Sequence, residues 1–145
     1  KEERKRKSGE EVPIPVPAGW EEEKSLAFAE NPVTIVKKTS IFPERIEEKK
    51  YTKWMDYDKI EKNPYIRTRR TGDYMVINAQ GNTKKLNRCM IDEKIPSEYR
   101  DSIPLIACGK EILWMVGSRM IERYKINPQT RKVLVLNYQG GYQNE

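Results

Sequence analysis

Short apolar runs separated by turn residues dominate the second half of the chain. Such runs of four to eight residues, rich in Val, Ile and aromatic side chains, are typical of β-strands. A two-residue turn containing Gly between two runs indicates a hairpin, and Pro is favoured where a turn needs its fixed φ angle. The pattern predicts three hairpins: residues 65–70 and 73–78 around Thr71-Gly72, residues 105–108 and 111–116 around Gly109-Lys110, and residues 123–127 and 131–138 around a turn with Pro128.

The first 60 residues give weaker signals. Prolines in VPIPVPAG (residues 12–19) favour an edge strand or an extended lead-in over a central strand. The acidic run at residues 21–23 indicates a solvated loop, and residues 41–50 a long polar loop. Two further strands are expected, at residues 33–38 and at residues 51–60, the latter followed by a short turn.

One helix is predicted at residues 83–93, capped by Asn82 or Thr83. A period of 3.6 residues places Leu86, Cys89 and Met90 on one face, which we expect to pack on the sheet. A short second helix is expected within residues 96–101, with Pro96 at its first position.

These elements predict a single α+β domain: a β-rich sandwich or barrel of hairpins with one or two inserted short helices. We expect residues 1–11 to be a charged linker or the end of a preceding helix, residues 12–140 to be the domain, and residues 141–145 to be a tail. The chain has no initiator Met, so we interpret it as a piece of a longer protein.

Positive charge is concentrated in one part of the chain. The net charge is +6, and residues 62–100 hold 9 basic and 4 acidic residues, a local charge of +5. Residues 1–61 hold 13 basic and 14 acidic residues, and residues 101–145 hold 6 and 4. A basic segment of this kind favours a polyanionic partner, with nucleic acid the first candidate, although a solvated basic surface explains the charge equally well.

The sequence lacks the residues that several kinds of catalytic and binding site require. The chain has no histidine, which removes Ser-His and Cys-His nucleophilic schemes. Cys89 and Cys108 are far apart and form no CxxC motif, so a disulfide scaffold or a zinc site is not expected, and both are interpreted as small apolar core residues. No phosphate-binding glycine loop and no apolar run long enough to span a bilayer occurs, so a soluble, cytoplasmic chain is expected.

The start of the predicted helix raises an electrostatic question. Lys84 and Lys85 fall in its first turn, where the helix dipole disfavours positive charge. A phosphate at this end, approaching free backbone N–H groups next to Gly81, explains them, while an ordinary solvent-facing helix side is the alternative. Other basic residues extend the candidate RNA-binding set: Arg88, Arg69, Arg70, Lys94, Arg100 and Arg119.

An ordered series of motifs over roughly residues 50–137 resembles the C-terminal domain of bacterial tRNA(Ile)-lysidine synthase. The family pattern runs R-x-x-G-D, G-x-x-K-K-L, D-x-K-[IV]-P, R-D-x-x-P and I-x-W-x-x-G-x-R. The matching positions here are Arg69, Gly72 and Asp73; Gly81, Lys84, Lys85 and Leu86; Asp92, Lys94, Ile95 and Pro96; Arg100, Asp101 and Pro104; and Ile112, Trp114, Gly117 and Arg119.

The resemblance implies a tRNA-modifying ligase as the parent protein. Enzymes of this family use ATP, with magnesium, and lysine to convert the wobble cytidine of the CAU-anticodon isoleucine tRNA to lysidine. Catalysis belongs to an N-terminal domain whose SGGxDS loop is absent here, so no catalytic, cofactor-binding or metal-binding residue is expected in this chain. The resemblance implies that this part grips the tRNA, around the acceptor stem, and that its fold is related to a domain of phenylalanyl-tRNA synthetase.

An alternative interpretation needs no RNA contact. The apolar run VLVLNY (residues 133–138), if it lay at a sheet edge, would suit an interaction module that packs against the parent's N-terminal catalytic domain or forms a homodimer.

Overall fold

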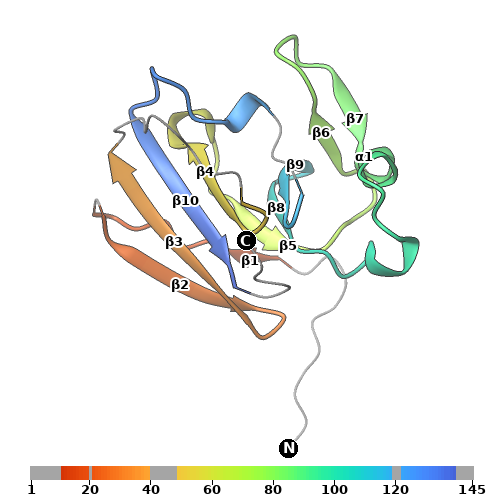
Figure 1. Cartoon of the computed structure of the whole chain (residues 1–145), viewed down its shortest axis with the longest axis horizontal. Coiled ribbons are helices and arrows are strands. Elements are labelled where there is room, and N and C mark those ends of the chain that lie inside the picture. Colours follow the sequence, from red (N-terminus) through yellow and green to blue (C-terminus); the bar gives the residue numbers. More distant parts are fainter. Residues whose placement is uncertain (1–10, 20, 40–48, 119–121, 140–145) are drawn as a thin grey trace, which may run out of the picture.

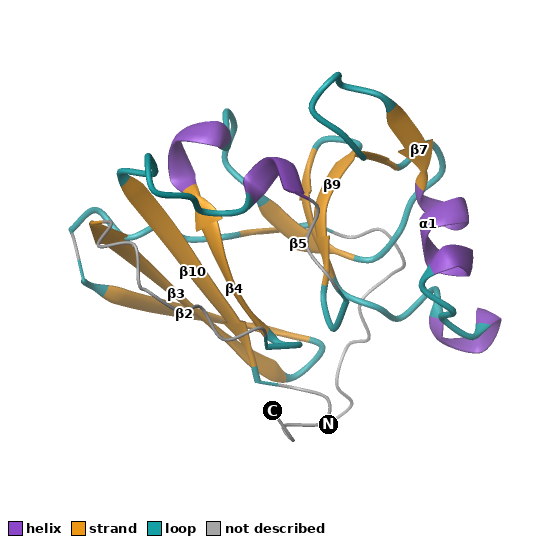
Figure 2. Ribbon diagram, turned by 45° about the horizontal axis from the view of Figure 1, so that its top comes forward, coloured by secondary structure: helices purple, strands orange, loops and turns teal. Residues whose placement is uncertain are grey.

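Two β-sheets pack face to face in the computed structural model, which describes residues 11–19, 21–39, 49–118 and 122–139 (Figures 1 and 2). The six-stranded sheet has the order β1 (Val12–Pro13), β5 (Tyr65–Arg67), β8 (Leu105–Cys108), β9 (Glu111–Met115), β6 (Tyr74–Val76) and β7 (Thr83–Lys85). The four-stranded sheet has the order β2 (Glu23–Phe28), β3 (Asn31–Thr39), β10 (Lys132–Tyr138) and β4 (Thr52–Asp56). The helical elements are α1 (Leu86–Asp92) and the 3-10 turns η1 (Tyr57–Lys59), η2 (Ser97–Tyr99) and η3 (Glu122–Tyr124).

The main core fills the space between the sheets. Alternate residues of β10 face inward, where Leu134 lies opposite Met55 and Leu136 opposite Ile35 in the strand register. Trp114 contributes the largest buried side chain, and its indole Nε1 donates to the Ser118 carbonyl at 3.0 Å. Trp114 is therefore a core residue whose one polar atom is hydrogen-bonded.

A second, smaller core lies on the opposite face of the six-stranded sheet. There α1 lays Leu86, Cys89 and Met90 against Met75, Leu105, Ala107, Ile112 and Met115. The predicted apolar helix face is therefore confirmed. In Figure 2, α1 and the β6–β7 pair lie at the end of the molecule away from the four-stranded sheet. Within the described ranges, no helix is long and apolar enough to cross a membrane.

Of the three predicted hairpins, only the middle one is confirmed. β8 and β9 pair antiparallel around Gly109-Lys110. The first prediction is wrong in its pairing: the chain turns at Thr71-Gly72, but β5 pairs with β1 and β8 while β6 pairs with β7 and β9. The two strands separate after the turn because each gains a partner distant in sequence, which a local pattern does not reveal.

The third hairpin is also wrong. Residues 122–124 form η3, and Lys125 makes a single bridge to Met55 of β4. The predicted turn does form, with Thr130 N–H donating to the Asn127 carbonyl at 2.9 Å. β10 lies between β3 and β4, so VLVLNY is central in its sheet and offers no edge for a partner. The alternative interpretation loses the edge on which it depended.

Most of the remaining strand predictions are confirmed. The proline-containing lead-in supplies β1 at the edge of its sheet, the run at residues 33–38 lies within β3, and residues 51–60 form β4 followed by η1, as predicted. The acidic run continues into strand β2, which the sequence pattern missed because five of its six residues are not buried. The predicted polar loop lies almost entirely within residues 40–48, outside the described residues.

The helix begins later than the sequence predicted. Residues Thr83–Lys85 form β7, paired antiparallel with Tyr74–Val76, and α1 starts only at Leu86. Lys84 and Lys85 are therefore strand residues, and neither Asn82 nor Thr83 caps the helix. Lys85 occupies the N-cap position without a side-chain cap, and the Leu86 N–H donates to the Asp73 carbonyl at 3.0 Å. The expected phosphate site on free N–H groups next to Gly81 is wrong, because Gly81 belongs to the β6–β7 loop.

Candidate nucleic-acid interface

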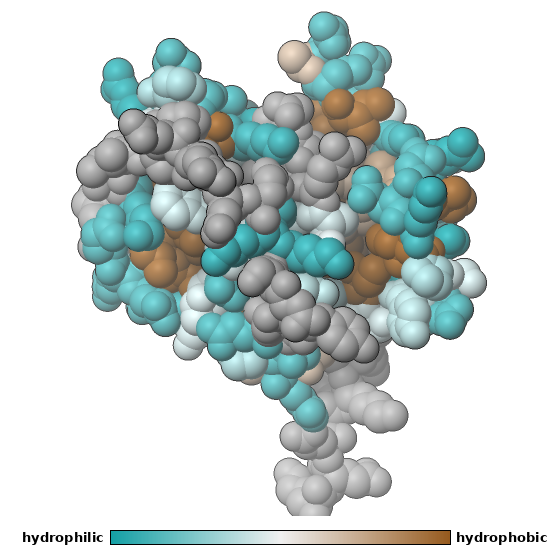
Figure 3. Space-filling view, viewed as in Figure 1, coloured by the Kyte–Doolittle hydropathy of each residue, from teal (hydrophilic) through white to brown (hydrophobic). Residues whose placement is uncertain are grey.

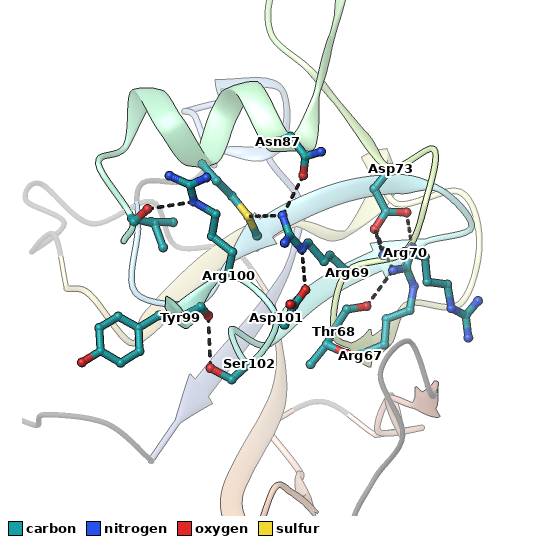
Figure 4. A network of polar contacts seen from close by, with 12 residues as sticks. Arg67, Thr68, Arg69, Arg70, Asp73, Asn87, Tyr99, Arg100, Asp101 and Ser102 are labelled. Atoms are coloured by element: carbon teal, nitrogen blue, oxygen red, sulfur yellow. Dashed lines mark hydrogen bonds and ion pairs between the residues drawn. The ribbon is translucent and has the colours of Figure 1, made fainter. Parts of the chain in front are cut away.

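A buried ion pair fixes the chain where it leaves β5. The Arg67 guanidinium, fully buried, donates through Nη1 and Nη2 to the two oxygens of Asp73, each at 2.9 Å. It also donates to the carbonyls of Thr68 and Gly109, and Asp73 accepts the Arg70 N–H at 2.8 Å (Figure 4). Asp73 therefore hydrogen-bonds the turn. These contacts also make Arg67 a structural residue, linking β5, the turn and the β8–β9 loop.

Arg69 and Arg100, both in the predicted RNA-binding set, are engaged inside the domain. Arg69 donates to Asp101 at 2.7 Å and to Asn87 of α1 at 2.8 Å (Figure 4). Arg100 donates through Nε to the Ile95 carbonyl at 2.9 Å. These contacts join the segment after β5, α1 and the loop around η2. Both arginines therefore help to hold the outer layer together, and part of their hydrogen-bonding capacity is used inside the domain.

Arg70 lies apart from the helix. Its guanidinium pairs with the Glu11 carboxylate at 3.4 Å, and Figure 4 shows its side chain extending away from the contacts of Arg69. Arg70 is thus paired with an acidic residue that precedes β1. Arg119, the last member of the predicted set, lies outside the described residues.

Lys84 and Arg88 share one carboxylate. Asp92, the last residue of α1, forms an ion pair with Lys84 of β7, and its other oxygen lies 3.6 Å from Arg88 Nε. The hydrogen bond between Lys84 and Asp92 raises the pKa of Lys84 and lowers the pKa of Asp92, so both remain charged. The spacing of Arg88 and Asp92, i and i+4 on a helix, is a signal from which the sequence analysis could have found this pair.

Lys85 and Lys94 carry their charge into solvent. Both are exposed, and within the described part of the chain neither ammonium has a hydrogen-bond or ion-pair partner. Lys85 closes β7 and Lys94 follows α1 with a positive φ of 60°, so the two bracket the helix. Figure 3 shows a largely hydrophilic face over β6–β7 and α1, interrupted by apolar side chains.

The loop between β6 and β7 is held in a defined shape by hydrogen bonds. Asn78 Oδ1 accepts the N–H groups of Gln80 and Asn82, both at 3.1 Å, and the Gly81 N–H donates to the Asn78 carbonyl at 3.1 Å. Nothing lies within 4 Å of the position that a Gly81 side chain would take. The loop therefore presents an ordered, open backbone at the tip of the basic edge strand.

The geometry suits recognition of a polyanion by shape and charge. Four basic residues from the predicted set lie on β7, on α1 or just after α1, and we name them the β7–α1 basic group: Lys84, Lys85, Arg88 and Lys94. Phosphates of a nucleic-acid backbone are contacted by such exposed cations without base reading. The described residues contain no group of three or more side chains able to hold a metal ion.

A two-sheet sandwich with a helix on the outer face of the larger sheet, bearing basic residues on its edge strand and helix, defines this chain as a small α+β domain. Its sequence identifies the family. A family model described as the TilS substrate C-terminal domain matches residues 65–137, about half of the chain, and the chain belongs to this family.

Curated relatives and a solved structure agree with that assignment. The tRNA(Ile)-lysidine synthase of Caldanaerobacter subterraneus subsp. tengcongensis is 50% identical over 88 residues, 61% of this chain and 19% of that protein. The enzyme of the same name from Clostridium tetani is 39% identical over 95 residues, 66% of this chain and 20% of that protein. The chain thus spans about a fifth of these relatives' length. A crystal structure of the TILS C-terminal domain matches with a TM-score of 0.67 and 27% identity, over 93% of this chain and 99% of that one.

Proposed function

We propose that this chain is the tRNA-binding C-terminal domain of a tRNA(Ile)-lysidine synthase. In the complete enzyme, this domain would hold the isoleucine tRNA with a CAU anticodon, through its acceptor stem. A separate N-terminal domain would use ATP, with magnesium, and lysine to modify the wobble cytidine in the cytoplasm of a bacterium. The domain itself supplies no catalytic group in this proposal.

The observation that carries the proposal is the β7–α1 basic group. Lys85 and Lys94 are exposed cations without internal partners among the described residues, and they flank a helix held rigidly by Leu86 and Met90. Duplex RNA is recognised mainly through its phosphates, 2′-OH groups and shape. A fixed group of cations on an ordered surface meets that requirement, because the register on the duplex is set by phosphate contacts.

The ion pairs inside the domain decide which substitutions can test the proposal. Lys84→Glu would place a carboxylate against Asp92 and disturb the fold, so a loss of binding would be ambiguous. Lys85→Gln and Lys94→Gln remove charge without removing a described contact. Lys24→Gln, on exposed strand β2 of the other sheet, removes one positive charge away from the group, the same change that either single variant makes.

Fluorescence anisotropy would measure binding to an acceptor-stem duplex of the isoleucine tRNA and to an unrelated stem, at about 50 mM and about 200 mM salt. We expect the double variant Lys85→Gln/Lys94→Gln to bind about tenfold more weakly, with a salt slope smaller by about two, one for each lost phosphate contact. We expect Lys24→Gln to match the parent. Equal affinities for all three folded proteins would refute the placement of RNA on this surface.

A further inference from the structure

We propose that Asp92 is a built-in competitor for RNA phosphate: its carboxylate occupies Lys84 and Arg88 in the free domain and must release them when RNA binds. This inference rests on the proposed function. It assigns Asp92 a role in setting the strength and selectivity of RNA binding, while Lys85 and Lys94 remain available for the first encounter.

The geometry of Asp92 resembles that of a phosphate held between two cations. Its Oδ2 contacts Lys84 Nζ from strand β7, and its Oδ1 lies 3.6 Å from Arg88 Nε, one helical turn earlier on α1. A carboxylate and a phosphate present similar oxygens to ammonium and guanidinium groups. All three side chains are between about a third and two thirds exposed (34%, 66% and 38% for Lys84, Arg88 and Asp92), so an incoming phosphate can reach the same cations.

Asp92 stands at an unfavourable place for a carboxylate. It is the last residue of α1, where the helix dipole is negative, and it is the wrong sign for that end. The helix contains no basic residue in its last turn to offset it. Lys84, through its hydrogen bond, stabilises the charged carboxylate and lowers the pKa of Asp92. The cations stabilise Asp92, and in return Asp92 neutralises much of their positive field.

The ion pair is not required to anchor the helix. Leu86 and Met90 are 2% and 0% exposed in the smaller core, and Asn87 ties α1 to Arg69. Exposed ion pairs of this kind contribute little to stability. Asp92 therefore adds little to the stability of the fold. Its main effect is to lower the affinity of Lys84 and Arg88 for other anions. Because phosphate contacts carry no sequence information, this effect suppresses binding to unrelated RNA.

The test compares Asp92→Asn with Glu93→Gln. Both variants raise the net charge by one, and Glu93 is the exposed neighbour, without an ion-pair partner among the described residues. The acceptor-stem and unrelated duplexes would be measured at two salt concentrations by anisotropy, after thermal unfolding has shown that the variants are folded. Asp92→Ser provides the same charge change should Asp92→Asn not fold.

We expect Asp92→Asn to bind both duplexes about three- to tenfold more tightly than Glu93→Gln does, with a steeper salt dependence. Its preference for the acceptor stem should be no greater than that of the parent. Affinities equal to those of Glu93→Gln would overturn the inference, and weaker binding would show that Asp92 positions the cations for RNA instead. If the parent binds neither duplex, the proposed function itself is refuted, and the inference fails with it.

Discussion

We expect the buried ion pair of Arg67 and Asp73 to contribute strongly to the stability of this domain, and Asp73→Asn tests that contribution. Asp73 has a side chain only 1% exposed and accepts three hydrogen bonds, two from Arg67 and one from the Arg70 N–H. Asparagine offers one acceptor oxygen and turns an N–H₂ group toward the guanidinium. Arg67 would then keep a buried charge that lacks its close carboxylate partner: the Thr68 and Gly109 carbonyls remain, and the Glu11 carboxylate lies 3.8 Å from its Nε.

The expected cost follows from that loss. Removing one partner of a buried ion pair costs about 3–5 kcal/mol, a large part of the 5–15 kcal/mol typical of a domain. For a chain of this length, we expect the midpoint of thermal unfolding to fall by about 10–20 °C. Urea unfolding followed by circular dichroism gives the free energy of unfolding, and calorimetry gives the thermal midpoint.

A matched control separates burial from charge. Asp101→Asn removes the same charge from a side chain that is 73% exposed and pairs with Arg69, and we expect a loss of about 1 kcal/mol or less. The double variant Arg67→Met/Asp73→Leu should recover part of the stability lost in Asp73→Asn, because no unpaired charge remains buried. An Asp73→Asn variant within about 1 kcal/mol of the parent, the size of the effect of an exposed ion pair, would refute this reasoning.

Two further predictions concern local conformation and pH. Gly72 has a φ of +92°, and a Cβ there would lie 3.2 Å from Lys110 Nζ, so Gly72→Ala should lower the free energy of unfolding by about 1–2 kcal/mol, measured by urea unfolding. Burial, and then a 2.6 Å hydrogen bond to Glu111, raise the pKa of Tyr124 above its ordinary value of 10.0. The folded state therefore favours the neutral phenol, and this contribution, present below pH 10.0, is lost as the pH rises further. Tyr124→Phe should weaken the fall in stability between about pH 9 and about pH 11, and an unchanged fall would exclude this role for Tyr124.

Local patterns decided much of the architecture. The alternation of residues in β3, β4 and β10, the β8–β9 hairpin and the apolar stripe of Leu86, Cys89 and Met90 could be predicted from the sequence, since each depends on side-chain periodicity or on a short turn. The ordered motifs over residues 50–137 also identified the family from the sequence, and the family model, the relatives and the solved structure confirm it.

Only the tertiary structure decided which strands pair and which cations are available. β5 and β6 separate because β8 and β9 lie between them, a contact set by residues some 40 positions away in the chain. Lys84 and Lys85 are strand residues rather than the first turn of a helix because β7 pairs with the neighbouring strand β6. Folding also places Asp101, Asn87 and Asp92 beside basic side chains that the sequence presents as free. The sequence determines which residues are charged. Which of these charges are neutralised depends on distances that exist only after folding, because ion pairs act over a few ångströms in space.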